Sequence, residues 1–76
     1  MKDLLAYIVK VLVNSPDQVE ITEETKGDQT VFRLKVAQED RGRVIGKRGK
    51  TVQAIRSVMN AAASLKNRRA DVEVID

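Results

Sequence analysis

The chain has 76 residues and a net charge of +3, and it contains neither cysteine nor histidine. This length leaves room for one domain, and the missing residue types exclude disulfides, thiolate chemistry, the usual general base and the commonest metal ligand. We therefore expect one domain over residues 1–76 that is not an enzyme and uses no cofactor and no metal.

The first segment, residues 3–13, has apolar residues at helical spacing and predicts a helix. Its apolar stripe consists of Leu4, Leu5, Ile8, Val11 and Leu12. Pro16 ends the segment, because proline disfavours a helical residue before it. Asp3 precedes the apolar run and Lys10 interrupts it, so we do not expect a signal peptide. No stretch approaches the roughly 18 to 20 apolar residues of a membrane span.

Two segments with alternating polarity, residues 19–23 and 32–36, predict an antiparallel hairpin with one buried face. Residues 26–29 form the turn between them. Acidic side chains dominate the outer positions of the first strand, while Arg33 and Lys35 occupy those of the second. We expect ion pairs across the two strands.

Residues 39–45 predict a short helix that begins with two acids, Glu39 and Asp40, where the helix dipole favours negative charge. Gly42 inside this helix costs about 1 kcal/mol relative to alanine, so it requires a reason. Gly46 and Gly49 follow it at spacings of four and three residues. Either a ligand approaches this bare backbone closely, or the glycines pack tightly against the next helix.

The longest periodic segment, residues 51–65, predicts the main core helix. Its core stripe is Val52, Ile55, Met59 and Ala62. A second stripe of small or apolar residues makes the helix more apolar than one small sheet requires. That stripe is Ala54, Val58, Ala61 and Leu65. It is either a subunit contact or a surface covered by the sheet and the first helix.

A basic turn over residues 66–69 leads to a final alternating strand, residues 71–75. The order is therefore helix, strand, strand, short helix, glycine turn, long helix, strand. This order predicts an α+β domain with helices packed on one face of a three-stranded sheet.

Positive charge is concentrated in the middle of the chain. Residues 1–32 carry −3, residues 33–56 carry +6, and residues 57–76 are balanced. Residues 41–51 hold three of the four glycines and five of the fourteen basic residues. This asymmetry predicts a polyanionic partner, and the alternative is an ordinary solvated face of long side chains.

The turn Gly46-Lys47-Arg48-Gly49 has a composition that suits a phosphate group. Glycine removes the side-chain obstacle, and successive exposed N–H groups can point at an anion. Lys47 and Arg48 add charge where a strand of nucleic acid would pass. The alternative is a chance pairing in which the first glycine is a helix C-cap.

The run VIGKRGKTVQAI, residues 44–55, resembles a KH domain. It has an apolar pair, Gly-x-x-Gly, and apolar residues three and six positions beyond the second glycine. The element order resembles the type II KH fold, α-β-β-α-α-β with a mixed sheet, and the likeness covers the whole chain. The chain is also similar to the small bacterial single-KH RNA-binding proteins of the KhpA family. This resemblance implies a cytoplasmic, non-catalytic binder of single-stranded RNA, an RNA chaperone in post-transcriptional regulation. It also implies a homodimer or a heterodimer with a Jag-type KH protein.

The resemblance also implies a set of RNA-binding residues. They are Arg43, Ile45, Gly46, Lys47, Arg48, Gly49, Lys50 and Val52. The four residues of the glycine turn would clamp the backbone of about four nucleotides. Ile45 and Val52 would line an aliphatic groove, with Val72 or Val74 along its other edge. Arg43 and Lys50 would attract phosphates, and a solvated surface position is the alternative for both.

Two other functions are consistent with parts of the sequence. Gly49-Lys50-Thr51 matches the end of the phosphate-binding loop of nucleotide hydrolases, but Val44 occupies the position of that loop's first glycine. The second is a protein-interaction adaptor that dimerises through the helix of residues 51–65. Only two aromatic residues, Tyr7 and Phe32, are present, which argues against RNA binding by base stacking on rings.

Overall fold

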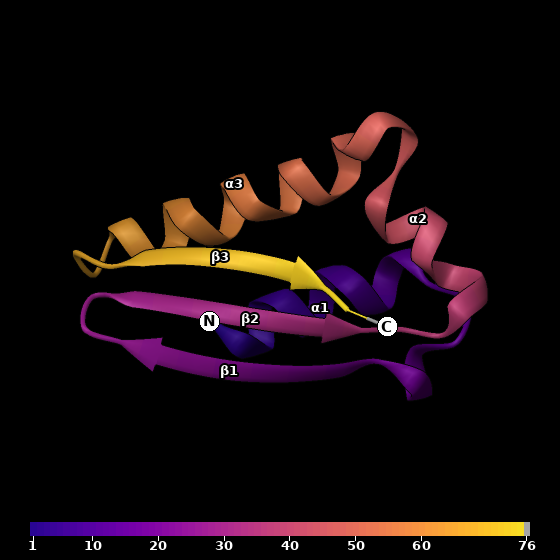
Figure 1. Ribbon diagram of the computed structural model, residues 1–76, viewed down its shortest axis with the longest axis horizontal. Helices are drawn as coiled ribbons and strands as arrows, with labels where there is room; N and C mark the ends of the chain where they lie inside the picture. Colours follow the sequence, from indigo (N-terminus) through magenta and orange to yellow (C-terminus); the bar gives the residue numbers. More distant parts are fainter. Residues whose placement is uncertain (76) are drawn as a thin grey trace.

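The computed structural model describes residues 1–75 and has the predicted α+β architecture (Figure 1). The main elements are α1 (Lys2–Leu12), β1 (Glu20–Lys26), β2 (Gln29–Lys35), α2 (Arg41–Ile45), α3 (Lys50–Ser64) and β3 (Arg69–Val74). Short 3-10 turns span Pro16–Gln18, Gln38–Asp40 and Lys47–Gly49. The predicted order α-β-β-α-α-β is confirmed, and every predicted element is present with ends shifted by a few residues.

The three strands form one mixed sheet in the order β1-β2-β3. β1 and β2 pair antiparallel, and the pairing of Lys26 with Gln29 leaves a two-residue turn at the predicted place. β2 and β3 pair parallel, which the α2–α3 connection between them makes possible. In β2, Thr30, Phe32 and Leu34 are buried while the residues between them are not, so one face of the sheet is covered.

The core joins that covered face to all three α-helices. Its fully buried members come from α1, β2, α2, α3 and β3. They include Leu5, Val9, Phe32, Leu34, Val44, Met59 and Val72. α2 is only five residues long, and Val44 is its buried residue. This contact fixes the helix that leads into the glycine turn.

Both long helices bury a stripe slightly different from the predicted one. In α1 the buried residues are Leu5 and Val9, whereas Leu4 and Val11 of the predicted stripe are exposed. In α3 the buried residues are Ile55, Met59 and Ala63; Val52 and Ala62 are half-buried. Apolar residues occupy so much of each helix that periodicity alone does not determine which arc faces the sheet.

The uncovered face of the sheet carries a cross-strand ion-pair network centred on Arg33. Its Nη1 donates to Glu24 Oε2 at 2.8 Å, and its Nε lies 3.6 Å from Glu73 Oε2. The hydrogen bond and the charge of Arg33 lower the pKa of Glu24, and the same contact raises the pKa of Arg33. The predicted pairing is confirmed for Arg33. Lys35 forms no ion pair with any residue in the described part of the chain.

Candidate nucleic-acid interface

The chain turns from α2 into α3 through three residues with positive φ. Gly46 has φ 76° and ψ 170°, Arg48 has φ 59°, and Gly49 has φ 74°. The Gly46 N–H closes α2 on the Gly42 carbonyl at 2.8 Å, and the Gly49 N–H donates to the Gly46 carbonyl at 3.1 Å. Arg48 is not glycine, so its left-handed conformation costs on the order of 1 kcal/mol or more. The glycine turn is therefore a specific, strained backbone shape.

Gly46 is required by its contact with the start of α3. A Cβ atom at this position would collide with the Thr51 hydroxyl oxygen and would lie 2.6 Å from Thr51 Cβ and 2.8 Å from Thr51 N. Gly42 and Gly49 have nothing within 4 Å of the corresponding position. Tight packing therefore occurs at Gly46. It was the wrong explanation for Gly42, which lies exposed on α2.

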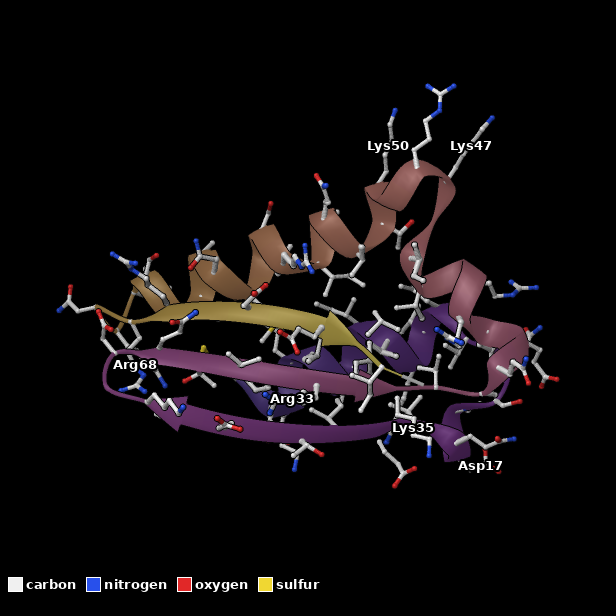
Figure 2. The ribbon with its side chains drawn as sticks, in the orientation of Figure 1. Asp17, Arg33, Lys35, Lys47, Lys50 and Arg68 are labelled. Carbon is white, nitrogen blue, oxygen red and sulfur yellow. The ribbon has the colours of Figure 1, made fainter. Side chains whose placement is uncertain are left out.

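The basic residues of the turn point away from the protein. Lys47, Arg48 and Lys50 are exposed, and Figure 2 shows Lys47 and Lys50 extending from the tip where α3 begins. None of the three forms an ion pair with another described residue. Arg43 is also exposed, with its Nε 3.9 Å from Asp40 Oδ1. The tip thus presents positive charge that no neighbouring acid neutralises.

The apolar residues assigned to the site differ in accessibility. Ile45 and Val52 are half-buried beside the turn, so each retains some exposed surface. On β3, Val72 is fully buried in the core, while Val74 is half-buried and packs against the edge of that core. Figure 1 shows α3 and β3 close together at their shared turn and diverging toward the glycine turn. Val74, and not Val72, is the strand residue with apolar surface left for a ligand.

A buried carboxylate, Asp40, holds α2 in place through contacts that were not predicted from the sequence. Asp40 is fully buried, and its two carboxylate oxygens accept hydrogen bonds from the backbone N–H groups of Asn14 and Ser15, both at 3.0 Å. The Ser15 hydroxyl hydrogen bonds to Glu39 Oε1 at 3.2 Å. Asp40 therefore ties the end of α1 to the start of α2. No local pattern relates residue 40 to residues 14 and 15, so sequence analysis assigned it only a helix-dipole role.

The second stripe of α3 is exposed along its length. All four of its residues, Ala54, Val58, Ala61 and Leu65, are exposed, with Val58 at 46% and Leu65 at 88%. The alternative in which the sheet and the first helix cover this stripe is therefore wrong.

Within residues 1–75 there is no acidic cluster that could hold a metal ion. In the same residues, no helix is long and apolar enough to cross a membrane.

Comparison with known proteins identifies the family. The model of the KhpA/KhpB KH domain matches residues 2–74. The chain belongs to this family. An RNA-binding protein KhpA of Clostridium acetobutylicum is 49% identical over 75 residues, which is 99% of this chain and all of that protein.

Two further RNA-binding proteins named KhpA, from Caldanaerobacter subterraneus and Chlamydia caviae, are 45% and 41% identical. The alignments cover 99% and 100% of this chain, and 100% and 97% of those proteins. These relatives are named as RNA-binding proteins, and the family is non-catalytic. Gly49-Lys50-Thr51 accordingly lies within a chain that matches a KH domain, and the nucleotide-hydrolase alternative is wrong.

Proposed function

We propose that the chain binds single-stranded RNA without catalysis, through the turn Gly46–Gly49 and the apolar surface beside it. The observation that carries this proposal is the glycine turn itself. Its backbone is set by three positive φ angles, and its cations have no acidic partner among the described residues. Backbone N–H groups and unpaired cations both favour phosphate oxygens. The relatives are named as RNA-binding proteins, which supports RNA as the ligand.

In this proposal each site residue has a separate task. Gly46, Lys47, Arg48 and Gly49 clamp the phosphates of about four nucleotides, while Arg43 and Lys50 add attraction without reading sequence. Ile45, Val52 and Val74 offer aliphatic surface to the bases. Residues 1–76 act as one KH domain, in the cytoplasm, as an RNA chaperone in post-transcriptional regulation.

A single short site gives modest affinity, so we also propose that the protein works as a dimer. The exposed stripe of α3 supplies an apolar surface for a second copy or for a Jag-type KH protein. Two linked sites raise the effective concentration of RNA at the second site once the first is occupied. The same stripe supports the alternative function, a protein-interaction adaptor in which the glycine turn is only a connector.

Charge reversal at the turn distinguishes the two functions. The variant Lys47→Asp/Arg48→Asp removes two phosphate-binding cations, and aspartate tolerates the left-handed conformation at position 48 better than most residues. The matched control is Lys2→Asp/Lys10→Asp, which changes the net charge equally on the exposed surface of α1. Circular dichroism verifies that both variants are folded.

We expect fluorescence-anisotropy titrations with short single-stranded RNA to show salt-sensitive binding by wild type and the control, and its loss in the turn variant. Equal RNA binding by both variants would contradict the proposed clamp. Absence of RNA binding by wild type, with dimerisation intact, would favour the adaptor.

A further inference from the structure

The two outer strands of the sheet, β1 and β3, each have one backbone edge that pairs with no other strand. On β3, side chains occupy this edge. Arg56 Nε donates to the Val72 carbonyl at 2.8 Å, and the Ala70 N–H donates to Asn60 Oδ1 at 3.3 Å. The Val72 N–H donates to Asp71 Oδ1 at 2.8 Å. The chain therefore satisfies the edge of β3 with its own side chains at Ala70 and Val72.

The strand register shows which backbone groups of β1 point away from the sheet. The Ile75 N–H donates to the Leu34 carbonyl at 2.9 Å, so the even-numbered residues of β2 direct their backbone groups toward β3 and the odd-numbered ones toward β1. These odd-numbered residues pair with even-numbered residues of β1, as Lys35 does with Glu20. Because hydrogen-bonded and non-hydrogen-bonded pairs alternate, the odd-numbered residues of β1 point their N–H and C=O groups outward. These residues are Ile21, Glu23 and Thr25.

No described residue covers this outward edge of β1. The backbone groups of Ile21, Glu23 and Thr25 that point outward receive no hydrogen bond from another described residue. β1 pairs with β2 residue for residue and contains no proline, so neither a bulge nor a proline blocks a further strand. Figure 1 shows β1 at the margin of the molecule, on the opposite side of the sheet from α3 and the glycine turn.

The charge of this edge determines which kind of strand it suits. β1 contains three glutamates and one lysine, which gives it a charge of −2. Glu24 pairs with Arg33, whereas Glu20 and Glu23 form no ion pair with another described residue. A second copy of β1 would bring the same glutamates to the edge, and like charges opposite one another destabilise a strand pair. A strand that carries lysine or arginine would instead place cations beside these carboxylates.

We propose that β1 binds a basic, extended segment of another protein, which joins the sheet as a fourth strand. The outward groups of Ile21, Glu23 and Thr25 supply main-chain hydrogen bonds, and the carboxylates of Glu20 and Glu23 select basic side chains. This surface does not depend on the proposed function. Because it lies across the sheet from the glycine turn, the segment and an RNA strand bind at the same time.

The test uses a synthetic peptide of about seven residues in which lysine alternates with valine, long enough to cover β1 at about 3.4 Å per residue. One control peptide has the same sequence with a methyl group on every backbone nitrogen, so it keeps its charge but has no backbone donor. A second control replaces each lysine by glutamate. NMR titration of the ¹⁵N-labelled protein measures affinity, and hydrogen exchange measures protection of the outward N–H groups.

Two variants separate the backbone contribution from the charge. Thr25→Pro keeps the charge and removes an N–H that makes no bond within the sheet, as an edge strand allows. Glu23→Lys reverses one charge, and Asp3→Lys makes the same change on the exposed surface of α1. Circular dichroism verifies that all three variants are folded.

We expect the lysine peptide to bind and to protect the amides of Ile21, Glu23 and Thr25 from exchange, and neither control peptide to do so. Thr25→Pro should weaken binding by about fivefold, as loss of one hydrogen bond does. Glu23→Lys should weaken it by about three- to tenfold, because an attraction becomes a repulsion. Asp3→Lys and Lys47→Asp/Arg48→Asp should bind the peptide as wild type does.

Three results would overturn the inference. Equal binding of the methylated peptide would show charge attraction without strand pairing, and equal binding of the glutamate peptide would show that the edge does not select basic segments. Protection of the same three amides that grows with protein concentration, without any peptide, would assign the edge to a second copy of the chain. RNA binding by the glycine turn is unaffected by each of these outcomes, so the proposed function is tested separately.

Discussion

The three glycines around the turn should respond differently to alanine, because each has a different reason to be glycine. At Gly46 two penalties combine. The backbone lies at φ 76°, ψ 170°, a region used almost only by glycine, and the new Cβ would collide with Thr51. The backbone term costs about 1–3 kcal/mol and overpacking about 1–3 kcal/mol. We therefore expect Gly46→Ala to lose about 2–6 kcal/mol of the free energy of unfolding.

Gly49 and Gly42 are matched controls for these two penalties. Gly49 has φ 74° but open space around its Cβ position, so Gly49→Ala should lose only about 1 kcal/mol. Gly42 has open space and lies inside α2 without a positive φ, so Gly42→Ala should gain up to about 1 kcal/mol. From the most to the least stable protein, we expect the order Gly42→Ala, wild type, Gly49→Ala and Gly46→Ala.

Urea unfolding followed by circular dichroism measures these differences in the free energy of unfolding. Thermal unfolding provides an independent measurement, because the midpoint temperature of a domain of this size shifts by about 4–8 °C per kcal/mol. The total free energy of unfolding of a domain of this length is roughly 4–11 kcal/mol. The loss expected for Gly46→Ala is therefore a large part of the total stability. Equal losses at Gly46 and Gly49 would refute the packing argument. A loss at Gly42 would refute the assignment of open space on α2.

Three further predictions concern the scaffold and the assembly. Asp40→Ala should lose about 2–3 kcal/mol in urea unfolding, because two charge-assisted hydrogen bonds disappear, and Glu39→Ala should lose far less. Because Arg33 lowers the folded-state pKa of Glu24 below its ordinary 4.5, this pair stabilises the fold above that pH and ceases to do so as pH falls through the folded-state value. Glu24→Gln should therefore make thermal stability less dependent on pH in that acidic range. Val58→Glu should shift sedimentation toward a monomer without unfolding the chain, and an unchanged sedimentation coefficient would contradict a dimer contact at this residue.

The order of elements follows from local patterns that the sequence displays directly. Alternation in residues 32–36 and helical spacing in residues 51–65 each reflect one buried face, and the fold buries those faces. The two-residue turn at Gly27 is equally local. These features depend on neighbours within a few positions, so they are readable without the tertiary structure.

Features that depend on distant contacts were not predictable in the same way. The arc of α1 that faces the sheet is centred on Leu5 and Val9, but Leu4 and Val11 are equally apolar. Asp40 is buried because residues 14 and 15 lie against it, and its sequence context resembles any acidic helix start. The close approach of Thr51 to Gly46, which leaves no room for a Cβ atom, likewise depends on how α3 follows the turn.

Arg56 of α3 illustrates the same limit. Its Nε donates a hydrogen bond to the Val72 carbonyl of β3 at 2.8 Å, and this contact was not predicted from the sequence. The partner is a backbone oxygen, which carries no sequence signal. The cations of the turn, in contrast, could be named from the sequence, because the proposed contact with phosphate requires exposure and not a partner within the chain.

The most direct test of the central claim is an NMR titration of the uniformly ¹⁵N-labelled protein with short single-stranded RNA. We expect the largest saturable shifts of amide signals on residues 46–50, with smaller shifts at Ile45, Val52 and Val74. Shifts centred on the exposed stripe of α3, with the signals of the turn unaffected, would contradict RNA binding by the glycine turn.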